Sequence, residues 1–371
     1  MKLRFKKHVA LTLISLMLLS LIGCGKPAST DTTTTTEAAV TEAPAASISD
    51  AATTADSTPA DASEEGSDVQ TVYPVTVTDQ AGREVTIEKE PESIVSGYYI
   101  STSLLLALGL KDKVTGIEAK ADKRPIYKLA APEFLELPNV GTAKEFDLET
   151  CASLSPELVI LPMKLKDAAQ SLSELDIPVL LVNPESEDQL EQMIELVSTA
   201  TNTKGNADAL LSYIDEKKEM LEKDLSGVEV KSVYLAGNSS LLSTAGPAMY
   251  QSGLIELAGG KNAASEITDT YWAEISYEQL LAWDPSYIIL ASDAEYTPED
   301  VLNDENLKEC TAVKNGNVYA IPGDIEALDS PVPGGILASI WLAGILHPDQ
   351  VSADMYTEEK AAFYETFYGI K

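Results

Sequence analysis

Two segments of this chain share one pattern: Asp147–Ile160 reads DLETCASLSPELVI, and Ser276–Ile289 reads SYEQLLAWDPSYII. In each, an aspartate or a serine begins a short helix-forming stretch, a glutamate follows two residues later, and a proline stands seven residues after that glutamate. The apolar run after the proline predicts a buried strand. The copies are 129 residues apart at the glutamates, Glu149 and Glu278, which predicts two similar halves.

The stretches before and after each copy match as well. Each half reads, in order, as a strand, a helix that ends in glycine, the copied segment, and a further strand. Strands that alternate with helices predict parallel sheets. We therefore expect an α/β fold of two Rossmann-like lobes with parallel sheets and a ligand cleft between the lobes. The matching pairs are Ile94–Ser96 with Val233–Leu235, Leu104–Gly109 with Leu254–Gly259, and Pro178–Val182 with Asn317–Ile321.

A long amphipathic helix is predicted between the two halves. At 1.5 Å per residue, residues 205–225 would form a single backbone helix of roughly 30 Å, which favours modest rocking of the lobes over wide hinge closure. The expected organisation is an N-terminal lobe at 72–204, a bridging helix at 205–227 and a C-terminal lobe at 228–371. The apolar residues that recur at helical spacing, with charges between them, are Leu210, Tyr213, Ile214, Leu221 and Leu225.

The first residues have the features of an export signal. Four basic residues precede the apolar run Val9–Ile22, which is shorter than the roughly 20 residues of a membrane-spanning helix. The run ends in Leu21-Ile22-Gly23-Cys24, which resembles a bacterial lipobox. We therefore expect residues 1–23 to be a signal peptide and Cys24 to carry the lipid anchor. The alternative is an ordinary signal peptide with a cysteine at this place by chance.

A polar segment separates Cys24 from the folded part. Residues 24–71 are rich in Thr, Ala, Ser and acidic residues, and Gly25–Gln70 contains no aromatic residue. Such a composition buries too little apolar surface to offset the entropy of ordering, so it predicts a disordered spacer. The folded part begins with a predicted hairpin, because Tyr73–Val77 and Glu84–Ile87 alternate on either side of a turn.

Composition excludes several classes of function. The 26 Lys and Arg against 59 Asp and Glu give a net charge of −33, which is unsuited to nucleic acid or to anionic lipid. Three cysteines exclude a disulfide scaffold, and we expect Cys151 and Cys310 to be buried thiols. Beyond the leader His347 is the only histidine, and G-x-S-x-G is missing, so a hydrolase is disfavoured. The sequence also lacks a cluster of His, Cys and Asp that would bind a bare metal ion.

Taken together, these features resemble the substrate-binding lipoproteins of ABC importers. The resemblance is to the helical-backbone class that binds iron–siderophores, haem and cobalamin, and it covers Val72–Lys371. No single motif is diagnostic, but their order and spacing are fairly specific. Besides the leader, the lipobox, the bridging helix and the repeated Glu-x(6)-Pro block, the motifs that carry it are Asp79-x-x-Gly82-Arg83, Ala312–Tyr319 and Ile340–Pro348.

The resemblance implies a receptor on the outer face of the cell membrane, held there by its lipid anchor. Such a receptor captures a chelated metal complex, an iron–siderophore foremost and haem or a corrinoid as further options. It delivers the complex to a dimeric ABC permease that works with an ATPase. The resemblance implies neither an enzyme nor a cofactor, and it implies a monomer that contacts no nucleic acid.

Two glutamates are expected to dock on the permease. In the family, one surface glutamate on each lobe enters an arginine pocket on the permease, and Glu149 and Glu278 match these positions. One acid per lobe suits a two-fold partner, because pairing with arginine fixes the register of the complex. A local role is also open, because an acid in the first turn of a helix gains roughly 0.3–1 kcal/mol from the helix dipole.

Ligand-contacting residues are expected in the loops after the strands, because ligands bind beyond the carboxyl ends of parallel strands. Aromatic side chains there would stack on a planar ligand, and basic ones would pair with an anionic ligand. A phenolate of Tyr98 or Tyr99 could instead hold haem iron. His347 is expected to be structural. The predicted ligand-binding residues are Tyr98, Tyr99, Arg124, Tyr127, Lys164, Asn238 and Trp272.

Three other functions stay open at this point. The first is a receptor of the same fold for an oxyanion such as molybdate or tungstate, which helix N-termini can bind without a side-chain signature. The second is a secreted enzyme that uses the cleft between the lobes. The third is a sensor lipoprotein that keeps the fold without a permease, because fold alone does not fix function.

Overall fold

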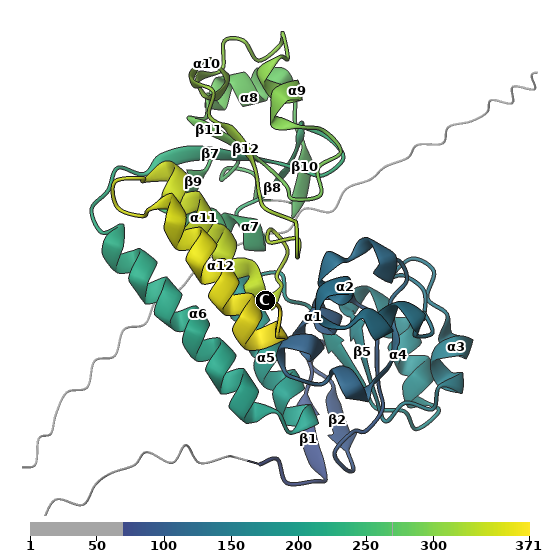
Figure 1. Cartoon of the computed structure of the whole chain (residues 1–371). Helices are drawn as coiled ribbons and strands as arrows, with labels where there is room; N and C mark the ends of the chain where they lie inside the picture. The colour runs from purple at the N-terminus through teal and green to yellow at the C-terminus, as the bar shows by residue number, and fades with distance from the viewer. Residues whose placement is uncertain (1–69, 269) are drawn as a thin grey trace, which may run out of the picture. The chain divides into compact units, whose positions relative to one another are not determined.

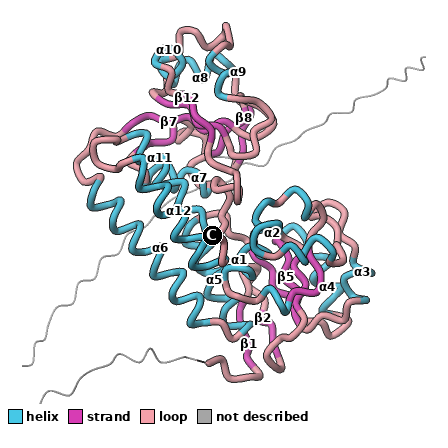
Figure 2. Tube along the Cα trace, in the orientation of Figure 1, coloured by secondary structure: helices cyan, strands magenta, loops and turns pink. Residues whose placement is uncertain are grey.

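The strand after Pro156 and the strand after Pro285 are internal strands of two parallel sheets (Figures 1 and 2). They are β5 and β11. A computed structural model describes residues 70–268 and 270–371. The strand orders, β4-β3-β5-β6 and β9-β7-β11-β12, are the same when each is counted from its own first strand, so the predicted fold class and repeat are confirmed. The strands are β3 Ile94–Ser96, β4 Val114–Ile117, β5 Leu158–Pro162, β6 Val179–Val182, β7 Lys231–Ala236, β9 Gly260–Asn262, β11 Tyr287–Leu290 and β12 Val318–Ala320.

Both faces of each central strand are buried. Along β5, Leu158 and Ile160 belong to one apolar cluster, and Val159 and Leu161 belong to another, as the alternation of a strand requires. The cluster that contains Leu158 also contains Ile289 of the second sheet. The two lobes, each a sheet with its covering helices, therefore share part of one core.

Helices cover both sheets (Figure 1). In the first lobe they are α1 Tyr99–Ala107, α2 Pro125–Ala130, α3 Leu148–Ser153, α4 Lys166–Ser173 and α5 Glu187–Thr201. In the second lobe they are α7 Tyr250–Leu257, α8 Tyr277–Trp283, α9 Pro298–Leu302, α10 Thr311–Asn315, α11 Ile336–Leu346 and α12 Ala353–Tyr368.

The predicted long helix is present as α6, Lys204–Asp224. It connects the two lobes in the chain and lies beside α11 and α12 (Figure 1). Leu210 and Leu221 are fully buried on its apolar side. Lys217 is also buried, and its ammonium lies 3.0 Å from a carboxylate oxygen of Glu359 on α12. The helix is therefore fixed to the second lobe by both apolar and charged contacts.

Two antiparallel pairs complete the strands. β1 Val75–Thr78 and β2 Glu84–Ile87 form the predicted hairpin. β8 Ser243–Ala245 pairs with β10 Trp272–Glu274.

The predicted signal peptide, Cys24 and nearly all of the spacer lie outside the described residues. The described residues belong to one compact unit. Within the described part of the chain, no helix has the length and apolarity needed to cross a bilayer. Cys151 and Cys310 are free and buried, which confirms that expectation. His347 is buried as well, with its Nε2 3.1 Å from the carbonyl oxygen of Gly259.

Candidate functional site

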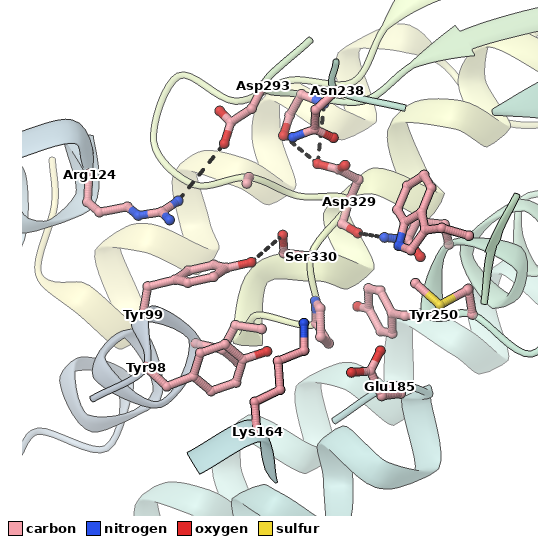
Figure 3. Close-up of a pocket in the computed structure, with 17 residues that line it drawn as sticks. Tyr98, Tyr99, Arg124, Lys164, Glu185, Asn238, Tyr250, Asp293, Asp329 and Ser330 are labelled. Carbon is pink, nitrogen blue, oxygen red and sulfur yellow. Dashed lines mark hydrogen bonds and ion pairs between the residues drawn. The ribbon is translucent and has the colours of Figure 1, made fainter. Parts of the chain in front are cut away.

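A cavity of about 390 Å³ lies between the two lobes (Figure 3). The loops that follow the parallel strands supply much of its lining. This agrees with the strand-end rule, by which ligands bind beyond the carboxyl ends of parallel strands. The first lobe contributes Tyr98, Tyr99, Ile100, Arg124, Lys164 and Glu185. The second lobe contributes Asn238, Met249, Tyr250, Gln251, Trp272, Ser292, Asp293, Ala327, Asp329, Ser330 and Pro331.

The structure brings most of the predicted ligand residues to this cavity. The residues on its lining are Tyr98, Tyr99, Arg124, Lys164, Asn238 and Trp272. The indole of Trp272 is placed by β10, is 39% exposed, and packs close to the backbone of Gly237. A Cβ at residue 237 would lie about 3.0 Å from that ring, so a larger residue there would displace the indole by a few tenths of an ångström.

Tyr127 is not on the lining of this cavity, but it lines a smaller neighbouring pocket together with Tyr99 and Arg124. It belongs to α2, is 1% exposed, and packs edge-to-face on Phe134. Its hydroxyl donates to Glu118 Oε1 at 2.6 Å. Arg124 precedes α2 and lines both pockets, whereas Tyr127 lies within α2 and is enclosed in the apolar core.

Arg124 and Tyr99, which both belong to the first lobe, each contact the second lobe. The guanidinium lies 3.9 Å from the centre of the Tyr99 ring, and its Nη1 is 4.0 Å from Asp293 Oδ2 in the second lobe. The Tyr99 hydroxyl donates to Ser330 Oγ at 2.9 Å, also in the second lobe. These contacts join the two walls at one side of the cavity (Figure 3).

The two tyrosines at the start of α1 are held in their neutral form. Burial is the main cause that raises the pKa of Tyr98 and of Tyr99. The nearby charge of Glu185 acts in the same direction on the pKa of Tyr98. Both residues are therefore neutral phenols at the cavity, and a phenolate bond to iron would require loss of a tightly held proton.

Asp329 is the most buried acid on the second-lobe wall, at 5% exposure. Its Oδ1 accepts from the Ser292 hydroxyl and from the Ser292 backbone N–H at 3.3 Å. Its backbone oxygen accepts from Gln251 Nε2 at 2.8 Å. Burial raises the pKa of Asp329, so the proton is bound more firmly than on an exposed carboxyl.

Several lining residues were not predicted from the sequence. Glu185 follows β6 and could have been found by the strand-end rule. Tyr250 and Gln251 begin a helix that follows β8, an extra strand outside the parallel sheet, so that rule does not reach them.

Within the described residues, no group of three or more His, Cys, Asp and Glu side chains is arranged to hold a metal ion.

Glu149 and Glu278 occupy equivalent places on the two lobes. Each is exposed in the first turn of its helix, α3 or α8, and each helix leads into β5 or β11. The side chains of Asp147 and Ser276 cap the two helices by accepting from a backbone N–H three residues later. In the described part of the chain, neither glutamate carboxylate has an ion-pair or hydrogen-bond partner, so both are available to a partner protein.

A buried acid beside the cavity makes stability depend on pH. Glu326 accepts from the Ser103 hydroxyl of α1 and, at 3.1 Å, from the Tyr364 hydroxyl of α12. Burial raises its pKa from the usual 4.5 to about 7, so the folded state holds this proton more tightly than the unfolded chain does. Its contribution is fully present below about pH 4.5 and is lost as pH rises through about 7, a loss on the order of 3 kcal/mol.

The variant Glu326→Gln tests this dependence, because an amide does not titrate. Denaturant unfolding at about pH 5 and about pH 8 should show the wild type losing roughly 2.5 kcal/mol more than the variant. Burial also raises the pKa of Glu118 and of Asp329, but those groups titrate in both proteins. Equal losses in both proteins would contradict the assignment to Glu326.

Several known proteins that resemble this chain in sequence or in fold are binding proteins. The family described as periplasmic binding protein matches residues 94–325. YvrC of Bacillus subtilis, named as an uncharacterized ABC transporter substrate-binding lipoprotein, is 29% identical over 70% of this chain and 82% of its own length. The molybdate-binding protein MolA of Haemophilus influenzae is 24% identical over 79% of this chain and 90% of its own. The crystal structure of a periplasmic solute binding protein from Veillonella parvula covers 80% of this chain and 93% of its own, with 26% identity and a TM-score of 0.71.

Proposed function

Because the chain belongs to the periplasmic binding protein family, we propose that it is the extracytoplasmic receptor that delivers a chelated metal complex to an ABC importer. The observation that carries the proposal is the cavity between the lobes, whose walls combine aromatic rings with charged and amide side chains. An iron–siderophore is the ligand that we place first. The volume of about 390 Å³ lies near the lower end of the roughly 300–1,000 Å³ of drug-sized sites, which favours a compact chelate over an intact corrinoid.

The way in which the ligand would be held follows from the walls. Tyr98 and Trp272 come from opposite lobes and offer ring faces for stacking. Arg124 and Lys164 supply donors to the oxygen atoms of a chelating group. Since both lobes contribute, a bound ligand would favour the arrangement in which the lobes are closed upon it.

We propose two further elements of the transport cycle. The lipobox-like sequence supports a lipid anchor at Cys24, and the relative YvrC is itself named a lipoprotein. The matched, exposed glutamates Glu149 and Glu278 support docking on two equivalent permease subunits. Together they would hold the receptor at the membrane while leaving the cavity open to solution.

A receptor for an oxyanion is the second candidate, because one relative is a molybdate-binding protein. A thermal-shift screen separates the candidates, using ferric siderophores, haem, a corrinoid and molybdate. A true ligand at 100 times its Kd should add about 2.7 kcal/mol, which corresponds to a rise in Tm of roughly 4 °C for a folded part of this size. Stabilisation by a ferric siderophore is the expected result.

The matched variants for this screen are Trp272→Ala and Tyr271→Ala. Trp272 lines the cavity, whereas its neighbour Tyr271 is 57% exposed and lies off the lining. The shift should shrink in the first variant and persist in the second. A panel in which no compound raises the Tm, or a shift that Trp272→Ala leaves intact, would overturn the proposal.

A further inference from the structure

The charges that line the cavity are nearly balanced, and this bears on which ligands it accepts. Two cations, Arg124 and Lys164, face three carboxylates, Glu185, Asp293 and Asp329. The acids are spread around the cavity, with Asp293 and Asp329 on one wall and Glu185 beside Tyr250 (Figure 3). With all five groups ionised the lining would carry one net negative charge, and protonation of the buried Asp329 would make it neutral.

The positive groups are therefore only partly available to an anion. Asp293 Oδ2 lies 4.0 Å from Arg124, and the guanidinium plane already covers the Tyr99 ring. The side chain of Asp293 is 58% exposed, so this pair is screened by solvent and weak. A ligand oxygen that approached Arg124 would nevertheless have the Asp293 carboxylate as its neighbour.

The second-lobe wall carries hydrogen-bond acceptors that a ligand donor could meet. Gln251 is 7% exposed, and its Nε2 donates to the backbone oxygen of Asp329. Its Oε1 is buried and has no hydrogen-bond partner within the described residues. Because that oxygen is enclosed, a ligand can reach it only if neighbouring atoms move. The accessible acceptor on this wall is the Asp293 carboxylate, whose side chain is 58% exposed and which favours a ligand N–H or O–H. The acid of Asp329 on the same wall adds to this preference.

We propose that the cavity selects a ligand of low net charge that carries both acceptor oxygens and N–H or O–H donors. The acceptors would face Arg124 and Lys164, and the donors would face Asp293 and Asp329. A strongly anionic chelate or a small dianion would satisfy the two cations but would meet three carboxylates without compensation. This inference rests on the proposed receptor function and names the class of ligand that the same site would take.

Two matched pairs of probes test the inference by isothermal titration calorimetry on the mature protein. The small pair is the uncharged bis-histidine complex of Ni²⁺, which has N–H donors and carboxylate oxygens, against molybdate, a dianion without donors. The large pair is an uncharged ferric trihydroxamate against a ferric tris-catecholate, which is a trianion. Within at least one pair the uncharged probe should bind at least about tenfold more tightly, equivalent to 1.4 kcal/mol.

Two charge-neutralising double variants test whether the carboxylates on the cavity lining cause the preference for an uncharged probe. Asp293→Asn with Glu185→Gln should raise the affinity of the anionic probe of the pair by about tenfold. Glu299→Gln with Asp349→Asn removes the same two charges from exposed residues outside the cavity lining, and should leave the affinity within about twofold. This control separates the local charges from the overall negative charge of the protein.

Three results would count against the inference. Tighter binding of the anionic probe in both pairs would overturn it and leave the receptor function standing. An equal gain in the two double variants would do the same, because overall charge would then explain the preference. Failure of all four probes to bind would overturn the proposed function, and this inference would fall with it.

Discussion

Replacing both Glu149 and Glu278 with arginine should abolish uptake of the ligand and leave its binding unchanged. Each glutamate is exposed on its own lobe, and neither contributes to the lining of the cavity. If each docks against arginine, reversal places like charges together at two places in one interface, at a cost of several kcal/mol. Since each 1.4 kcal/mol is a factor of ten in affinity, uptake should fall by at least about a hundredfold.

The measurement is uptake of the labelled ligand into cells that carry the permease and its ATPase. Calorimetry with the same ligand on the purified variant checks that binding persists. A single reversal should reduce uptake by less than the double reversal, because one docking contact remains.

A matched control removes the local effect of charge at a helix start. Asp167 and Glu299 are exposed acids in the first turns of α4 and α9, one in each lobe. Reversing both costs the same roughly 0.3–1 kcal/mol per helix as reversing Glu149 and Glu278. Uptake should survive in this control. If uptake also survives in the Glu149→Arg, Glu278→Arg protein, the two glutamates serve their helices alone.

The arrangement of the two sheets could be predicted from the sequence because it depends on local patterns that occur twice. The strand after Pro156 and the strand after Pro285 are continuous apolar runs, which a parallel sheet buried on both faces requires. Their helices begin at residues that cap a helix, Asp147 and Ser276. Each signal lies within about fifteen residues, so no long-range contact had to be known.

The cavity was predictable only where a parallel strand leads directly into it. Tyr98, Lys164 and Asn238 follow β3, β5 and β7, so the strand-end rule placed them correctly. Gln251 reaches the cavity from a helix outside that pattern. Tyr127 shares a smaller pocket with Arg124 but does not line the main cavity, because its hydroxyl donates to the buried Glu118.

The burial of single polar residues was the feature of the fold that could least be predicted from the sequence. Glu118 and Glu326 are acids in a chain with 59 acidic residues, and nothing in the pattern marks them as buried. Each is buried because hydroxyl groups from other elements reach it: Thr102 and Tyr127 for Glu118, and Ser103 and Tyr364 for Glu326. Such partners become visible only once the chain is folded.

The same is true of Asp79, which the sequence marked only as part of a turn and of a family motif. Its carboxylate is fully buried and accepts five hydrogen bonds. Oδ1 accepts from the backbone N–H groups of Ala81 and Arg83 at 3.0 and 2.9 Å. Oδ2 accepts from Arg83 Nε and Nη2 at 2.9 and 2.7 Å and from the backbone N–H of Leu181 at 3.0 Å. Leu181 belongs to β6, the outer strand of the first sheet, so Asp79 ties the hairpin to the edge of that sheet.

Asp79→Ala should therefore be among the most destabilising single changes in the chain, by about 3–5 kcal/mol. The change leaves the N–H of the fully buried Leu181 without an acceptor and Arg83 without its counter-ion. Denaturant unfolding of the mature protein measures the loss. Glu84→Ala, an exposed change in the same hairpin, should stay within about 0.5 kcal/mol.

Arg83→Ala decides whether the ion pair or the backbone bonds matter more. The arginine side chain is 28% exposed, and without it the Asp79 carboxylate would still accept from three backbone N–H groups. Its removal should cost about 1–3 kcal/mol, clearly less than Asp79→Ala. An equal or larger loss for Arg83→Ala would assign the stability to the ion pair and to the bond from Arg83 Nη2 to the Val179 carbonyl.

Because β6 continues into the loop that carries Glu185, a weakened edge in Asp79→Ala should also lower ligand affinity, whereas Glu84→Ala should not.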